Sequence, residues 1–145
     1  MREPVELTFR ECLDLLGAGM VGRLALSTPV GPRIVPVNYA LIDDSLLFRT
    51  TPYSELATYG SGSEVAFEID HLDYERQRGW SVVALGRLRP VEPDELDDLR
   101  KVWDPRPWAG GMRTFYLELP WRDLSGRRIG NDWTHATMTP VRRVL

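Results

Sequence analysis

Residues 22–51, GRLALSTPVGPRIVPVNYALIDDSLLFRTT, decide the fold that we expect for this chain. Runs of apolar, β-branched and aromatic residues alternate here with the turn segments PVGP and DDS, a pattern typical of consecutive strands. These turns are far shorter than the connection of about a dozen residues that parallel strands need. The stretch therefore predicts three strands of an antiparallel sheet.

The same pattern continues downstream. Three further strands are expected at EVAFEID (64–70), WSVVALGRLRPV (80–91) and TFYLELPW (114–121), with the polar stretch HLDYERQRG (71–79) as a loop. Helical signals mark YSELATYG (53–60) and EPDELDDLRKVW (92–103). We expect one mainly β domain over residues 1–145: a barrel over about 20–124, flanking helices, and a polar tail over 125–145.

The glycines of LLGAGMVGRLAL (15–26) have the spacing G-x-G-x-x-G. In dinucleotide-binding proteins this motif follows a strand and opens a helix. Here a helix over about 8–16 precedes the glycines, because Thr8 and Glu11 form a capping box, and a strand follows them. We therefore interpret Gly17 as the C-cap of the helix and exclude a dinucleotide-binding loop.

The amino-acid composition excludes several classes of protein. The chain is 43% hydrophobic and 27% charged with a net charge of −3, which is ordinary for a globular domain and argues against a nucleic-acid-binding surface. No apolar run has the length of a membrane span, so we expect a cytoplasmic protein. The single cysteine, Cys12, is interpreted as a packing residue, and His71 and His135 offer little for metal binding, so no metal is expected.

Pro36 stands inside the predicted strand RIVPVNYALI (33–42). Proline cannot donate a hydrogen bond to a sheet ladder, so this strand lies at an edge, contains a bulge, or faces something other than a strand. A flat aromatic ligand against the backbone would satisfy that requirement, and Asn38 could then bond the edge of its ring through the side-chain amide.

Four stretches in this order resemble the FMN-binding split barrels related to pyridoxamine phosphate oxidase: 22–41, 43–56, EVAFEID and GWSVVALGRLRPV (79–91). The tripeptide PVN on the second strand and GWSV on a later strand carry the closest similarity, and DLSGRRI (123–129) matches the end of the last strand. The resemblance covers about 7–130. It implies a six-stranded antiparallel split barrel that forms a homodimer, with FMN in two clefts at the interface.

The resemblance also implies which residues bind the cofactor. The flavin ring would lie against the second and third strands, and arginines with hydroxyl groups would hold the phosphate. A strand from GWSV would close the cleft, where Trp80 is either a cover for the ring or ordinary core. The implied cofactor-binding residues are Arg33, Val35, Pro36, Val37, Asn38, Arg49, Thr50, Thr51, Ser54, Trp80 and Ser81.

Glu55 departs from the family pattern, in which a lysine or arginine usually stands at this position beside the phosphate. A carboxylate there repels a phosphate group. The implied function is a flavin-dependent oxidoreductase acting on a small molecule, with the flavin carrying the redox chemistry. The alternative is a non-catalytic dimer that binds a flavin, a deazaflavin or haem at a degraded phosphate site.

Overall fold

The structure is a computed structural model that describes residues 3–102 and 114–130. Six long strands form its body: β2 (Val21–Thr28), β3 (Gly31–Ile42), β4 (Ser45–Thr50), β5 (Glu64–Asp73), β6 (Arg78–Arg87) and β8 (Phe115–Ile129). Two-residue strands, β1 (Val5–Glu6) and β7 (Arg89–Pro90), add to its edges. The helices are α1 (Phe9–Ala18), the π-helix η1 (Leu56–Gly60) and α2 (Pro93–Val102).

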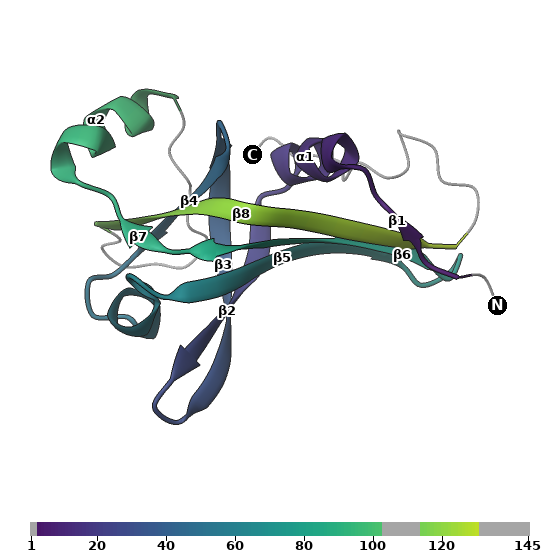
Figure 1. Cartoon of the computed structure of the whole chain (residues 1–145), viewed down its shortest axis with the longest axis horizontal. Coiled ribbons are helices and arrows are strands. Elements are labelled where there is room, and N and C mark those ends of the chain that lie inside the picture. Colours follow the sequence, from purple (N-terminus) through teal and green to yellow (C-terminus); the bar gives the residue numbers. More distant parts are fainter. Residues whose placement is uncertain (1–2, 103–113, 131–145) are drawn as a thin grey trace.

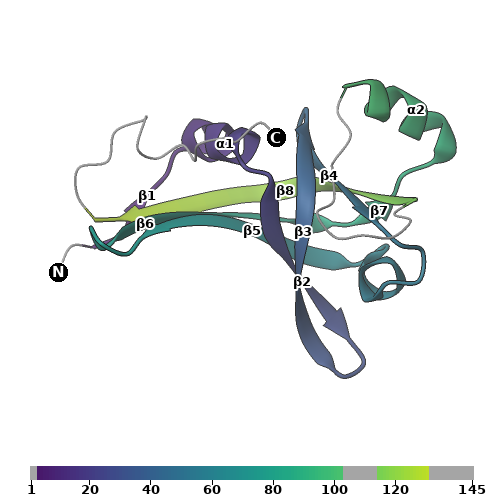
Figure 2. The same cartoon turned by 180° about the vertical axis from the view of Figure 1, so that it is seen from behind.

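The six long strands close into a ring. Neighbours around it are β2, β3, β4, β8, β6 and β5, and β5 pairs back onto β2. Every one of these pairings is antiparallel. The expected antiparallel barrel is confirmed. Figure 1 shows a long layer of β5, β6 and β8, with α1 and α2 on one side and the β2–β3 hairpin extending from the other. Figure 2 shows the same arrangement from behind.

The first helix begins as predicted but ends later. Thr8 is its N-cap, and the reciprocal bonds of the capping box with Glu11 are present at 3.1 Å each. The helix continues through Gly17 to Ala18, and its C-cap is Gly19, so the assignment of Gly17 as the cap is wrong. Glycine is needed at 19 for space, because a Cβ there would collide with the hydroxyl of Tyr39.

Two predicted irregular segments are strand. Residues 71–73 extend β5, and the expected loop shrinks to a turn at 74–77 that is held by Asp73, which bonds to Arg76 and Arg78. Residues 125–129 of the expected tail belong to β8, where they pair with β6 and β1. Their sequence is polar because alternate side chains face solvent. Residues 131–145, including His135, lie outside the described part.

The core has two parts. The larger lies inside the barrel and under α1, and it contains Cys12, Phe48, Phe67 and Trp80. The smaller lies on the far side of β3 and β4, where Leu96 and Leu99 of α2 pack against Ala40, Ile42, Leu47 and Tyr116. The first helix buries Cys12, Leu15 and Leu16, whereas Phe9 at its start is 56% exposed. Residue 103, at the end of the last predicted helix, lies outside the described residues. The interpretation of Cys12 as a packing residue is confirmed by its complete burial.

Candidate functional site

The first half of β3 is an open sheet edge. Residues 31–38 pair with β2, whereas β4 pairs only with residues 39–42. The pairing with β2 has no register shift, so the edge interpretation of Pro36 is confirmed and the bulge is excluded.

The hydrogen-bond pattern shows which backbone groups point outward from this edge. The N–H of Tyr39 donates to Met20 O at 3.1 Å, and in an antiparallel pair such bonds recur at every second residue. Odd-numbered residues of β3 therefore face β2. The N–H and C=O of Ile34 and the C=O of Pro36 point to the side without a strand, where Pro36 offers no N–H. This edge presents a short row of backbone groups to a ligand.

Side chains along the edge divide between two faces. Val35 and Val37 pack against the main core, whereas Ile34 is 70% exposed and Pro36 is also exposed. The amide of Asn38 donates to Met20 O at 3.4 Å, so part of its bonding capacity ties β3 to the segment before β2. The apolar side chains support the strand, and its backbone remains accessible at Ile34 and Pro36.

The end of β4 and the segment after it supply hydroxyl groups. Thr50 points inward and is 4% exposed, while Arg49 lies on the opposite face with its guanidinium 5.1 Å from the centre of the Tyr116 ring. The hydroxyl of Thr50 donates to Ser54 Oγ at 2.8 Å, and the same oxygen accepts from Ala57 N at 3.0 Å. The neighbouring Thr51 is half-buried.

An ion pair joins the β3 edge to this segment. Arg33 Nε lies 3.7 Å from Glu55 Oε1, and both side chains are about half exposed, at 52% and 49%. The residue that departs from the family pattern thus faces one of the arginines that the resemblance assigned to the phosphate. The structure thus places Arg33 beside Glu55, whereas Arg49 lies on the opposite face of β4, over Tyr116.

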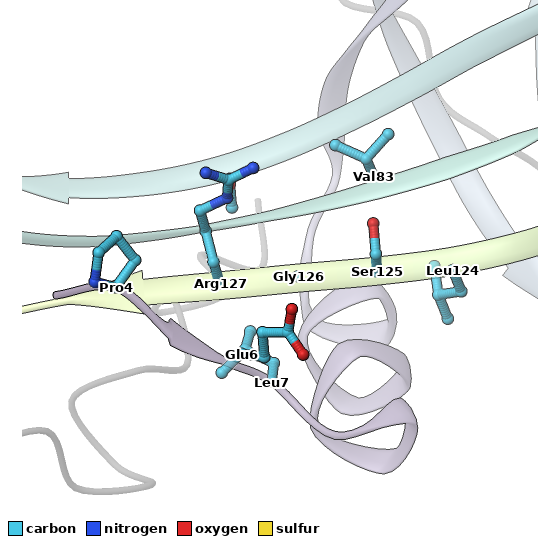
Figure 3. A pocket seen from close by; sticks show the side chains of 9 residues that line it. Pro4, Glu6, Leu7, Val83, Leu124, Ser125, Gly126 and Arg127 are labelled. Atoms are coloured by element: carbon cyan, nitrogen blue, oxygen red, sulfur yellow. The ribbon is translucent and has the colours of Figure 1, made fainter.

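Trp80 and Ser81 lie elsewhere on the barrel. Trp80 is 2% exposed within the main core, and its ring centre lies 6.3 Å from that of His71. Ser81 pairs with Asp70 on one side and Arg127 on the other. It lines a groove of about 790 Å³ beside β1 and β8, together with residues that include Glu6, Val83, Ser125 and Arg127. Figure 3 shows Val83, Ser125 and Arg127 extending from the same side of this layer.

These residues belong to a larger surface, which we call the outer face. Strand alternation separates it from the core, and the register aligns its members across β2, β5, β6 and β8. It lies on the side of β6 and β8 opposite α1, whose residues pack in the main core. Its central members are Arg23, Ala25, Ala66, Glu68, Asp70, Ser81, Val83, Leu85, Ser125 and Arg127.

A charged cluster on the outer face was not predicted. Arg23 Nη2 lies 2.7 Å from Asp70 Oδ1 and 3.0 Å from Glu68 Oε1. Burial and the neighbouring Asp70 raise the pKa of Glu68, and the hydrogen bond to Asp70 raises the pKa of Arg23. Strand alternation places these residues on one face, but the pairing of β2 with β5 that joins them is not visible in the sequence.

Two further classes of site were searched for in the described residues. In residues 3–102 and 114–130, no three His, Cys, Asp or Glu side chains are grouped so that they could hold a metal ion. Within the same ranges, no helix is long and apolar enough to cross a membrane.

Known proteins identify the family. A model of the pyridoxamine 5'-phosphate oxidase family matches residues 8–128. The chain belongs to this family. The uncharacterized protein Rv0080 of Mycobacterium tuberculosis is 32% identical over 137 residues, which cover 90% of this chain and 89% of that protein. The similarity inferred from the four sequence stretches is thereby confirmed.

Solved structures of the same fold support this assignment. The FAD binding protein from Mycobacterium smegmatis matches with a TM-score of 0.74 and 26% identity, over 88% of this chain and 99% of that one. The conserved protein of unknown function DIP1874 from Corynebacterium diphtheriae matches with a TM-score of 0.71 and 26% identity, over 87% and 98%. Membership of the oxidase family therefore agrees with the closed, six-stranded arrangement of the long strands.

Proposed function

We propose that the protein binds a flavin along the open edge of β3 and uses it as a redox cofactor. The observation that carries this proposal is the edge itself: residues 31–38 have a strand on one side only, and Pro36 removes a donor from the other side. The pyrimidine edge of a flavin ring carries both donors and acceptors, which match the N–H of Ile34 and the C=O groups of Ile34 and Pro36.

In this proposal the ring lies against residues 35–38, and the phosphate lies near Arg33 and residues 49–54. Arginine binds phosphate through paired N–H groups, and Thr51 and Ser54 can donate from their hydroxyls. The hydroxyl of Thr50 supports Ser54, to whose Oγ it donates. The proximity of Arg33 to Glu55 supports placing these elements in one site. The ring portion fits the residues present, while Glu55 weakens the phosphate portion.

The second half of the proposal is a homodimer through the outer face. Trp80 and Ser81 cannot join the β3 edge of their own chain, because β5 and β2 intervene in the sheet. A second copy packed on the outer face would bring its Ser81 to that edge. The half-buried apolar side chains of Val83, Leu85 and Ala66 give this surface an apolar centre, as interfaces have.

The chemistry would come from the flavin, which accepts and donates hydride, while the protein supplies binding and orientation. We propose an oxidoreductase acting on a small molecule. FMN is the cofactor that the family resemblance implies, and the similar protein from Mycobacterium smegmatis is an FAD binding protein. A deazaflavin is the alternative of the same shape. Glu55 favours a second candidate, a binding protein without turnover.

The test is a fluorescence titration of flavin with purified protein, followed by reduction with NADH or NADPH. We expect quenching of the flavin at micromolar protein, and bleaching of its absorbance when the donor is added. Binding without bleaching by any donor would favour the non-catalytic candidate. Absence of quenching with riboflavin, FMN and FAD alike would reject flavin binding.

A further inference from the structure

We propose that two copies of the chain join about a two-fold axis that runs along the strands between β2 and β5, so that β3 of each chain lies against β6 of the other. This inference rests on the proposed dimer and names its contacts. It assigns Ile34 to a contact with Leu85 of the partner subunit, and Arg23 to a contact with Glu68 of the partner subunit.

Two rows of side chains cross the outer face from β3 to β6. The pairing of β3 with β2, of β2 with β5 and of β5 with β6 fixes the members of each row. One row consists of Ile34, Ala25, Ala66 and Leu85. The next row consists of Pro36, Arg23, Glu68 and Val83. Strand alternation keeps both rows on the face opposite the core.

Each row has the same chemistry when it is read from either end. The first has large apolar side chains at its ends and alanines in the middle. The second has apolar side chains at its ends and an arginine beside a glutamate in the middle. A two-fold axis between β2 and β5 lays each row on its own reverse, because it exchanges β2 with β5 and β3 with β6. In such a contact apolar side chains meet apolar ones, and each arginine meets a glutamate.

The charged pair suits the centre of this contact. Arg23 Nη2 lies 3.0 Å from Glu68 Oε1 in its own chain, and the two side chains are still 40% and 37% exposed. A second copy adds a glutamate against each arginine, so that positive and negative charges alternate around the axis. Asp70 lies in the row of Ser81 and holds Arg23 in place at 2.7 Å. The neighbouring alanines are small, which lets the two sheets approach closely.

The ends of the rows connect this contact to the proposed cofactor site. Ile34 is 70% exposed on the open edge of β3, and Leu85 is half-buried on β6. Contact between them removes apolar surface from water. Asn38 and Ser81 stand in the next row, at its β3 and β6 ends. The same axis therefore brings Ser81 of the partner subunit to Asn38, at the edge where we propose that the flavin binds.

The experiment exchanges one apolar contact for an ion pair between two different chains. Ile34→Lys and Leu85→Glu each place charges against apolar side chains in a homodimer, so each variant alone should have the mass of one chain in light scattering. A heterodimer pairs the lysine with the glutamate and keeps one native contact. In a flavin-free mixture of equal amounts, the variants should form a dimer at least about tenfold tighter than either homodimer.

The control carries the same negative charge at another exposed position. Leu72 is 52% exposed on β5 and lies outside both rows. In a mixture with Leu72→Glu, Ile34→Lys should therefore stay monomeric. Rescue cannot arise within one chain, because β2 and β5 separate Ile34 from Leu85.

A second pair of variants tests the same axis if Leu85→Glu does not unfold cooperatively in urea. Pro36→Glu places its charge beside Arg23, and Val83→Arg places its charge beside Glu68. Each chain therefore tolerates its own substitution. These two variants should also form a tight dimer only when they are mixed.

The outcomes separate this inference from the proposed function. If the wild type has the mass of one chain, the proposed dimer fails and the axis with it. If the wild type is a dimer but the single variants stay dimeric, or neither mixed pair associates, the axis between β2 and β5 is overturned while the dimer stands. Flavin takes no part in these measurements, so a failure of flavin binding would leave the contact unchanged.

Discussion

Arg23 of β2 reaches across to β5 and places its Nη2 atom 2.7 Å from the carboxylate of Asp70. The same nitrogen also bonds Glu68 at 3.0 Å. The two carboxylates are unequal, because the bond to Asp70 is the main cause that raises the pKa of Arg23, whereas burial and Asp70 raise the pKa of Glu68. Asp70 therefore stabilises the cluster. Ionised Glu68 destabilises it, because its carboxylate is partly buried and lies close to that of Asp70.

This inequality predicts different effects of two conservative substitutions at pH 7. Asp70→Asn should lower the free energy of unfolding by about 1 kcal/mol, a value discounted for solvent screening at these partly exposed side chains. Glu68→Gln keeps an oxygen for Arg23 and removes the repulsion, so it should stay within about 0.5 kcal/mol of the wild type. Urea unfolding at one fixed protein concentration gives both values, and equal losses would contradict the assignment.

The pH dependence of Glu68→Gln follows from the raised pKa of Glu68. A carboxyl with a raised pKa in the folded state contributes stability that is present below its unfolded pKa and lost as pH rises through the folded pKa. Any gain in the free energy of unfolding of Glu68→Gln over the wild type should therefore appear above the folded pKa of Glu68. The gain should vanish near pH 4, where the carboxyl is about half protonated or more.

Two glycines should respond to alanine with opposite signs. A Cβ on Gly126 of β8 would stand 2.8 Å from Cys12 Sγ and 2.9 Å from Ser81 O, so Gly126→Ala should destabilise the protein by about 1–3 kcal/mol. Gly17 lies inside α1, and a Cβ there meets only Leu41 at 3.6 Å. Gly17→Ala should thus stabilise it by about 0.5 kcal/mol. Urea unfolding measures the stability of both variants. A lower free energy of unfolding for Gly17→Ala would indicate that Gly17 acts as the helix cap after all.

The parts of the fold that the sequence predicts are those specified by local chemistry. Thr8 and Glu11 define the start of α1 because a capping box needs only four consecutive residues. Pro36 indicates an open edge because proline lacks an N–H in any context. The local pattern did not mark residues 125–129 as strand, because they are polar and Gly126 carries no apolar signal; only the family resemblance matched 123–129 to the end of the last strand.

The candidate site is less predictable because it depends on contacts between distant segments. Arg33 and residues 49–54 were expected to share a site, and this stays a prediction; the contact of Arg33 with Glu55 depends on where η1 packs. The separation of Ser81 from the β3 edge follows from the order of strands around the ring. A motif-by-motif interpretation places both in one cleft, whereas within one chain they lie on different parts of the ring.

Substitution of Arg49 tests the proposed phosphate site, because a phosphate-binding role and a purely structural role predict different effects on flavin binding. Its guanidinium lies over the ring of Tyr116, and that contact alone would affect only stability. We expect Arg49→Gln to weaken FMN and FAD binding about tenfold and to leave riboflavin binding unchanged. Tyr116→Phe keeps the ring beneath the guanidinium and serves as the control. Equal loss for all three flavins would assign Arg49 to folding alone.

The proposed dimer is tested at Val83, which lies on the outer face between Glu68 and Ser125 in the register. Val83→Arg places a charge at the centre of this surface, but beside Glu68, so the monomer should tolerate it. The wild type should have twice the chain mass of 16.6 kDa in light scattering, and the variant the mass of one chain. Phe9→Arg, at a 56% exposed position of α1 on the opposite side, should remain dimeric.

The same variant separates a composite cofactor site from one built by a single chain. Val83 stands on β6, which is three strands away from β3 around the ring, so the substitution does not touch the β3 edge of its own chain. If the partner supplies Ser81, monomeric Val83→Arg should lose flavin binding at least about tenfold while its unfolding by urea stays cooperative. A monomer that binds flavin as tightly as the wild type would show that each chain holds its cofactor alone.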